Sequence, residues 1–78
     1  MDRHPKFKIN DKVRHLIEGK VMTVKYENVH RKISNHGSGL YDEFLGTYCC
    51  YYTDNSGKYQ ELDRVPEEVL ILAWQIFS

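Results

Sequence analysis

A run of seven strand-forming residues followed by a turn signal constrains the fold more than any other part of the sequence. Residues 47–53 read Thr-Tyr-Cys-Cys-Tyr-Tyr-Thr, and β-branched and aromatic side chains of this kind favour strands. Residues 54–57, Asp-Asn-Ser-Gly, are typical of a tight turn, and residues 58–62 indicate a returning strand. The sequence therefore predicts an antiparallel hairpin over residues 47–62.

The first half of the chain carries two shorter strand signals. Residues 11–16 and 21–26 alternate between apolar and polar side chains, as a strand with one buried face does. Gly19 lies in the predicted bend between them, and Asn10 is expected to take the left-handed backbone conformation that asparagine tolerates. In the second strand, one face is predicted to carry Met22, Val24 and Tyr26.

No regular pattern runs through residues 27–46. Their apolar side chains are scattered among His, Asn, Ser and three glycines. An irregular connection of about twenty residues is unusual in a chain of 78, and such loops are typically either functional or disordered. We therefore expect a long loop or insertion here.

The C-terminal segment allows two interpretations. Pro66-Glu67-Glu68 is a good helix start, and the apolar residues after it could line one face of a helix. The alternative is a single 3₁₀ turn at residues 66–69 followed by a strand at residues 70–74. We favour the turn and strand, because a small barrel needs its last strand to remove an open edge.

An ordered set of short motifs spans both halves of the sequence. It comprises Phe7-x-x-Asn10-Asp11-x-Val13, Gly19-x-x-Met22-Thr23-Val24, Cys49-x-Tyr51-Tyr52 before the turn at 54–57, and Pro66-Glu67-Glu68-x-Leu70. Together these resemble the YodC-like family of small uncharacterised bacterial proteins, although Asn10 stands where that family usually has Gly, and Tyr51 where Trp is common. The match skips residues 27–46. The resemblance implies an SH3-like barrel and carries no activity with it.

The predicted fold is thus mostly β: one domain over residues 1–78, a small SH3-like barrel of about five strands. The long loop of residues 27–46 separates its second and third strands, and a short 3₁₀ turn precedes the last strand. Residues 1–6 are polar and are expected to be frayed.

The charge balance bears on nucleic-acid binding. Lysine and arginine total 11, aspartate and glutamate total 11, and the net charge is zero, whereas domains that bind phosphate backbones usually carry a basic excess. Nucleic-acid binding is therefore the alternative function and not the favoured one. Its candidate residues are in the mildly basic N-terminal stretch: Lys6, Lys8, Lys12 and Arg14.

Several classes of protein are not expected. No apolar run reaches the roughly 18 residues of a membrane span, and no apolar signal-peptide region follows Met1, so we expect a cytoplasmic protein. Cys49 and Cys50 are neighbours whose side chains should point to opposite faces of a strand, so they are predicted to be free thiols without zinc. We expect no cofactor, and no catalytic residues, because no nucleophile signature surrounds either cysteine.

The remaining hypothesis is binding of an unidentified protein or peptide by a monomer or weak homodimer. Long loops on rigid scaffolds often carry recognition residues, and small barrels can gather surface aromatic side chains for peptide binding. The candidates are Tyr41, Phe44, and whichever of Tyr48, Tyr51 and Tyr59 point outward. Two simpler interpretations stay open, namely that these tyrosines form the core and that the loop is an insertion without a role.

Overall fold

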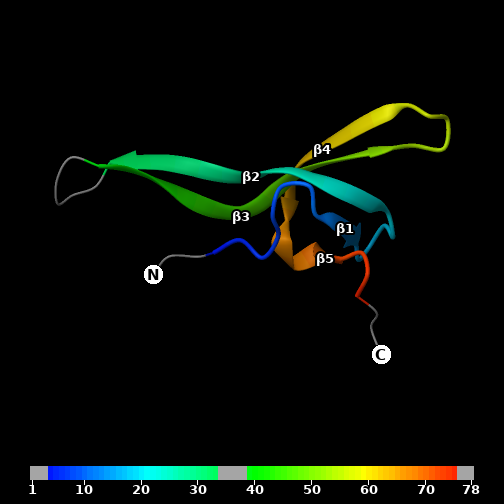
Figure 1. Ribbon diagram of the computed structural model, residues 1–78, viewed down its shortest axis with the longest axis horizontal. Helices are drawn as coiled ribbons and strands as arrows, with labels where there is room; N and C mark the ends of the chain where they lie inside the picture. The colour runs from blue at the N-terminus through cyan, green and yellow to red at the C-terminus, as the bar shows by residue number, and fades with distance from the viewer. Residues whose placement is uncertain (1–3, 34–38, 76–78) are drawn as a thin grey trace.

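The computed structural model describes residues 4–33 and 39–75, and it shows one antiparallel sheet of five strands in the order β4-β3-β2-β1-β5 (Figure 1). The mostly-β class, the five strands and the 3₁₀ turn before the last strand are confirmed. In the described part of the chain the sheet is not closed into a barrel, since β4 and β5 are its two edges. The elements are β1 Lys12–His15, β2 Val21–Ile33, β3 Leu40–Thr53, β4 Tyr59–Pro66, the 3₁₀ turn η1 Glu67–Val69, and β5 Leu70–Leu72.

The C-terminal segment is a strand and not a helix. β5 pairs antiparallel with β1, with Val13 opposite Leu72 and His15 opposite Leu70. The η1 turn reverses the chain after β4, so that β5 reaches the far side of β1. This pairing covers the outer edge of β1 with a three-residue strand.

The prediction of a long irregular loop over residues 27–46 was wrong. Residues 27–33 continue β2, residues 40–46 continue β3, and these two segments pair with each other as a ribbon, which we term the hairpin arm. Residues 34–38 lie outside the described residues. The arm left no alternating pattern in the sequence, because alternation appears only where one face of a strand is buried.

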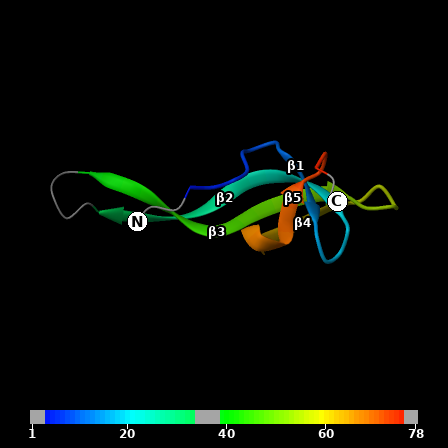
Figure 2. The ribbon, with the colours of Figure 1, turned by 90° about the horizontal axis from the view of Figure 1, so that it is seen from below.

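The hairpin arm extends beyond the rest of the sheet (Figures 1 and 2). The long axis of the molecule measures 50 Å. Its radius of gyration is 14.8 Å, whereas a compact domain of this length has about 11.5 Å. In the described part of the chain, the pairing of β1 with β2 stops at Thr23 and the pairing of β4 with β3 stops at Thr47, so both edges of the arm are open.

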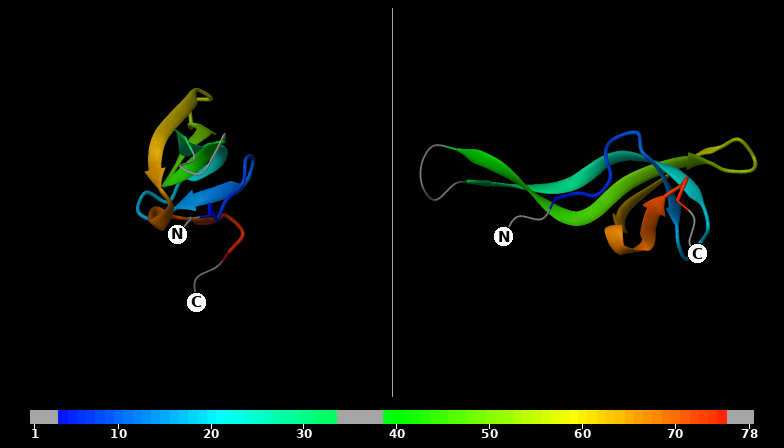
Figure 3. Two further views of the ribbon diagram at one scale, coloured as in Figure 1. Left: turned by 90° about the vertical axis from the view of Figure 1, so that its left-hand side faces the viewer. Right: turned by 60° about the horizontal axis from the view of Figure 1, so that its bottom comes forward.

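Two register shifts interrupt the pairing of β2 with β3. The register shift between Val24 and Tyr26 turns Tyr26 away from the core, so the prediction that it shares a face with Met22 and Val24 was wrong. A second irregularity at the base of the arm includes Gly46, whose φ of 84° is accessible chiefly to glycine. Figure 3 shows the arm as a twisted ribbon, as expected next to such shifts. Asn10 takes the predicted left-handed conformation, with φ 76°.

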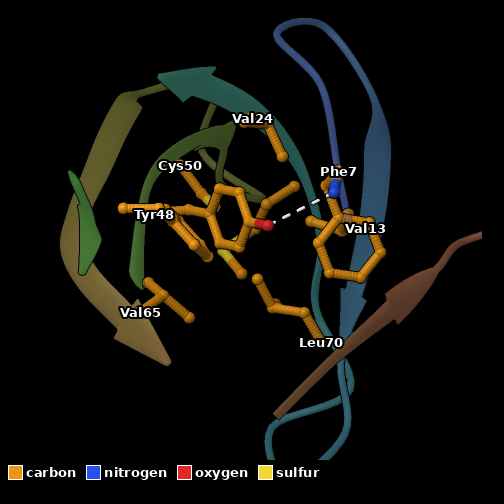
Figure 4. Close-up of a cluster of buried hydrophobic side chains, with 9 residues drawn as sticks. Phe7, Val13, Val24, Tyr48, Cys50, Val65 and Leu70 are labelled. Atoms are coloured by element: carbon orange, nitrogen blue, oxygen red, sulfur yellow. Dashed lines mark hydrogen bonds between the residues drawn. The ribbon is translucent and has the colours of Figure 1, made fainter. Parts of the chain in front are cut away.

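The hydrophobic core lies on the face of the sheet that is covered by β1, β5 and the segment before β1 (Figure 4). Tyr48 is at its centre and is 0% exposed. The rings of Phe7 and Phe44 pack against the Tyr48 ring with centroids 5.4 and 5.3 Å away. The core comprises Phe7, Val13, Met22, Val24, Phe44, Tyr48, Cys50, Val65 and Leu70.

Inside this core, the Tyr48 hydroxyl joins three distant segments. It donates to Glu67 Oε2 at 2.5 Å and accepts from the Phe7 amide at 3.2 Å, while the Lys6 amide donates to the same Glu67 oxygen at 3.0 Å. We call this network the Tyr48 clasp. Burial, and then the hydrogen bond to Glu67, raise the pKa of Tyr48 far above its usual value. The clasp anchors Lys6, where fraying was expected; residues 1–3 of that predicted segment lie outside the described residues.

Replacing Tyr48 with Phe should lower the free energy of unfolding by about 1–3 kcal/mol, because the buried Glu67 carboxylate loses one of its donors and the Phe7 amide loses its acceptor, while the aromatic ring is kept. Urea unfolding followed by fluorescence measures the change. Tyr59→Phe is the matched control, since Tyr59 is 54% exposed and its hydroxyl bonds to the exposed Glu61. Equal effects of the two substitutions would contradict a structural role for the clasp.

Candidate functional site

The structure divides the five predicted binding residues among three places. Tyr48 is fully buried and faces the core, so it is not one of the outward-pointing tyrosines to which the prediction applies. Phe44 is 8% exposed and belongs to the core, but it also lines a hollow together with Tyr41. Tyr51 and Tyr59 lie together on the opposite face of the sheet, with their rings stacked.

The hollow lies where the hairpin arm joins the rest of the sheet, which we call the body. It is between the arm and the segment before β1. It has a volume of about 470 Å³, within the range of sites that hold small molecules. Figures 1 and 3 show the N-terminal segment passing beside the base of the arm. We call it the basal hollow; it is lined by His4, Pro5, Glu27, Val29, Tyr41, Asp42, Glu43 and Phe44.

The apolar part of the basal hollow is continuous with the core. Val29 pairs directly opposite Phe44 across the arm, so their side chains share a face. The Phe44 ring packs against Tyr48, whose hydroxyl helps to hold the N-terminal segment. The Tyr48 clasp therefore supports both the floor of the hollow and the segment that carries His4 and Pro5.

The polar part of the basal hollow is acidic. Asp42 Oδ1 accepts a hydrogen bond from Arg31 Nε at 3.2 Å, and Glu43 forms an ion pair with Lys32 that holds its pKa below the usual value. Glu27 is only partly exposed, and its carboxylate has no ion-pair partner among residues 4–33 and 39–75. The rim thus carries three carboxylates, of which two are paired within the arm.

The second candidate surface is the outer face of the sheet, which we define as the side opposite the core. The registers place Lys12, Thr23, Tyr51 and Glu61 in one row across four strands. Tyr51 and Tyr59 stack in this region, with ring centroids 5.7 Å apart and planes at 27°. The outer face therefore brings predicted peptide-binding tyrosines beside a predicted nucleic-acid-binding lysine.

Glu61 is the centre of the polar contacts on the outer face. It receives hydrogen bonds from Lys25 Nζ at 2.9 Å, from Tyr59 Oη at 2.7 Å and from Cys49 Sγ at 3.4 Å. These donors, Lys25 above all, hold the pKa of Glu61 at about 2. Glu61 is consequently ionised at neutral pH and fixes the orientation of Tyr59 beside Tyr51.

The four basic candidates do not form a single patch. Lys12 Nζ donates to Thr23 Oγ1 at 2.6 Å on the outer face, and Arg14 lies two positions along the same strand. Lys6 and Lys8 are exposed in the segment before β1, outside that row. Only Lys12 and Arg14 therefore lie on the same face as the stacked tyrosines.

The two cysteines are free and lie on opposite sides of β3, as the alternation predicts. Cys50 is in the core opposite Val24, whereas Cys49 pairs with Tyr26 and contacts Glu61. Burial raises the pKa of both thiols, that of Cys50 to about 11. Both are therefore protonated at neutral pH, and protonated thiols are poor nucleophiles.

The described residues also bear on metal binding and on membrane insertion. No group of three or more His, Cys, Asp or Glu side chains is arranged there to hold a metal ion. No helix in residues 4–33 and 39–75 has the length and apolar character needed to span a bilayer.

Sequence reasoning missed the residues that complete the basal hollow: His4, Pro5, Glu27 and Val29. The missing step was recognising the arm as a hairpin. A signal for it does exist in the charges, since Arg31-Lys32 is basic and Asp42-Glu43 is acidic. In an antiparallel pair these two segments can neutralise each other, as they do in the structure.

Comparisons with known proteins supply no relative. No family model matches the chain, and neither the curated proteins nor the solved structures contain a match.

The outer-face cluster predicts an unusual titration. Glu61 should titrate at a pH of about 2 in the folded protein, and Lys25→Met should raise its pKa towards the ordinary 4.5, because the main donor is lost. Since folding lowers this pKa, the cluster stabilises the protein above about pH 4.5 and loses that contribution as the pH falls towards 2. Carboxyl ¹³C NMR titration measures the pKa of Glu61. An ordinary value in the unsubstituted protein would contradict the geometry of the cluster.

Proposed function

We propose that this protein is a non-catalytic binding module that captures a protein or peptide at the hairpin arm and the basal hollow. The observation that carries the proposal is the position of the hollow. It has an aromatic floor that is continuous with the core, and it lies at the base of a ribbon that projects from the body. A concave apolar site on a rigid support is the usual form of a recognition site.

The arm itself supports this proposal through its exposed apolar surface. Its two strands pair only with each other beyond the body, and an isolated two-stranded ribbon is marginally stable in water. A group of exposed apolar side chains is typical of an interaction surface. On the arm these are Val29, Ile33 and Leu40 on one face, and Tyr41 and Leu45 on the other.

The open edges of the arm offer a second mode of contact. Backbone groups on the outer edges of β2 and β3 have no neighbouring strand along the arm in the described residues. An extended segment of a partner can add to such an edge through main-chain hydrogen bonds, while neighbouring pockets select its side chains. The basal hollow lies next to these edges and can supply that selection.

We also infer an SH3-like fold, membership of the YodC-like family and a cytoplasmic location. The five-stranded order with β5 against β1, and the η1 turn before β5, support the fold. The motifs that resemble the family fall on the body of the molecule, at residues 7–13, 19–24, 49–52 and 66–70. The arm occupies the interval between the second and third of these motifs.

One observation favours nucleic-acid binding as a second candidate function. Lys12 and Arg14 share the outer face with the stacked Tyr51 and Tyr59, and single strands are bound by aromatic stacking next to basic residues. The balanced net charge and the carboxylate of Glu61 at the centre of that face oppose this function. It therefore ranks below protein binding.

Photo-crosslinking tests the proposed function. A photoreactive phenylalanine analogue at Tyr41 should crosslink a partner in cells that naturally produce the protein, whereas the same analogue at Ile17, which is 80% exposed but far along the chain from the arm, should not. Replacing residues 30–43 by Asn-Gly keeps Val29 opposite Phe44 and should abolish capture by the shortened protein. Equal crosslinking from both positions, or capture that survives the shortening, would contradict the proposal.

The second candidate has its own test. Fluorescence anisotropy with labelled single-stranded DNA and RNA should show negligible binding at about 150 mM salt, because few phosphates can be neutralised by a chain with no net charge. A sub-micromolar complex at that salt, lost on Lys12→Glu and Arg14→Glu, would make nucleic-acid binding the leading function.

A further inference from the structure

The carboxylates of the basal hollow are not all paired within the described residues. Its lining contains the carboxylates of Glu27, Asp42 and Glu43. Arg31 pairs with Asp42 and Lys32 pairs with Glu43 across the arm. The remaining carboxylate, that of Glu27, has no ion-pair partner among the described residues.

The position of Glu27 makes that carboxylate relevant to binding. Glu27 lies directly opposite Tyr48 in the β2–β3 register, at the point where the arm joins the body, and it is only partly exposed. Its carboxylate is therefore available to form an ion pair with a cation from outside the chain.

The rest of the lining suits the stem of a long basic side chain. Phe44, which shares a face of the arm with Val29, offers an aromatic ring to a guanidinium or ammonium group, an attractive contact at close range. Val29 and Pro5 offer apolar surface to the methylene groups that carry such a charge. An acidic side chain or a phosphate would instead meet the unpaired carboxylate of Glu27, which disfavours anionic ligands.

We propose that the basal hollow is a pocket for one basic side chain, arginine or lysine, of an extended segment in a partner protein, with Glu27 as its counter-ion. This proposal rests on the proposed function and adds to it the chemistry of the partner. The partner segment lies along the open edge of the arm and inserts its basic residue where the arm meets the body. Asp42 and Glu43 contribute to the negative potential while they keep their own partners.

Titrating ¹⁵N-labelled full-length protein with blocked pentapeptides tests this proposal. The probes are acetyl-Gly-Val-X-Val-Gly-amide with X as arginine, lysine, glutamate or norleucine. The arginine or the lysine peptide should shift the amides of Glu27, Val29 and Asp42, and the glutamate and norleucine peptides should bind at least tenfold more weakly. Equal shifts at these amides by the glutamate or norleucine peptide would overturn the assignment of a basic residue.

Variants locate the contact. Glu27→Gln should weaken binding of the basic peptide about tenfold, as expected for loss of a hydrogen bond to a charged group. Glu18→Gln makes the same change in charge in the turn before β2, away from the hollow lining, and should leave binding unchanged. An equal loss of affinity in both variants, or no loss in either, overturns the role of Glu27.

The failure of this proposal can be told from failure of the proposed function. If none of the four peptides shifts the amide signals of Glu27, Val29 and Asp42 while crosslinking from Tyr41 persists, the arm binds a partner by another chemistry. If the crosslink is also absent, both proposals fail. Amide spectra of Glu27→Gln and Glu18→Gln that overlay on the parent spectrum show that both variants are folded.

Discussion

The buried hydroxyl of Tyr48 is the contact on which the other features of this protein depend. It lies at the centre of the core and bonds to Glu67 in the η1 turn and to the amide of Phe7 in the N-terminal segment. The first bond fixes the turn that delivers β5 to β1, and the second holds the segment that carries one wall of the basal hollow. One side chain thus couples the edge of the sheet to the candidate site.

The hairpin arm exists because its base is attached to that same core. Phe44 stands on the arm but packs against the Tyr48 ring, so the first cross-strand pair of the arm, Val29 with Phe44, is held in place. Further out, the two exposed ion pairs, Arg31–Asp42 and Lys32–Glu43, contribute little free energy each. Stability is therefore expected to decline along the described part of the arm from its base.

The parts of the structure that follow from local pattern could be predicted, and those that depend on distant contacts could not. The hairpin over residues 47–62 and the turn at Pro66 were predicted because their residues act through their immediate neighbours. The arm was missed because neither of its faces is buried along its length, so its strands have no alternation. Alternation along residues 47–53 correctly separated the side chains of the two faces, but it did not predict which face lies against the core. The inward position of Tyr48 depends on contacts with Lys6, Phe7 and Glu67, which are distant in the sequence.

Amide hydrogen exchange at Lys6 and Phe7 tests the central claim most directly, since these two amides donate to the clasp and the segment before them forms a wall of the basal hollow. The account predicts that both amides exchange as slowly as those of the paired residues of β1, although they lie outside any strand. Exchange at the rate of an unstructured chain would show that the N-terminal segment is not held by Tyr48 and Glu67. The hollow would then lack one of its walls.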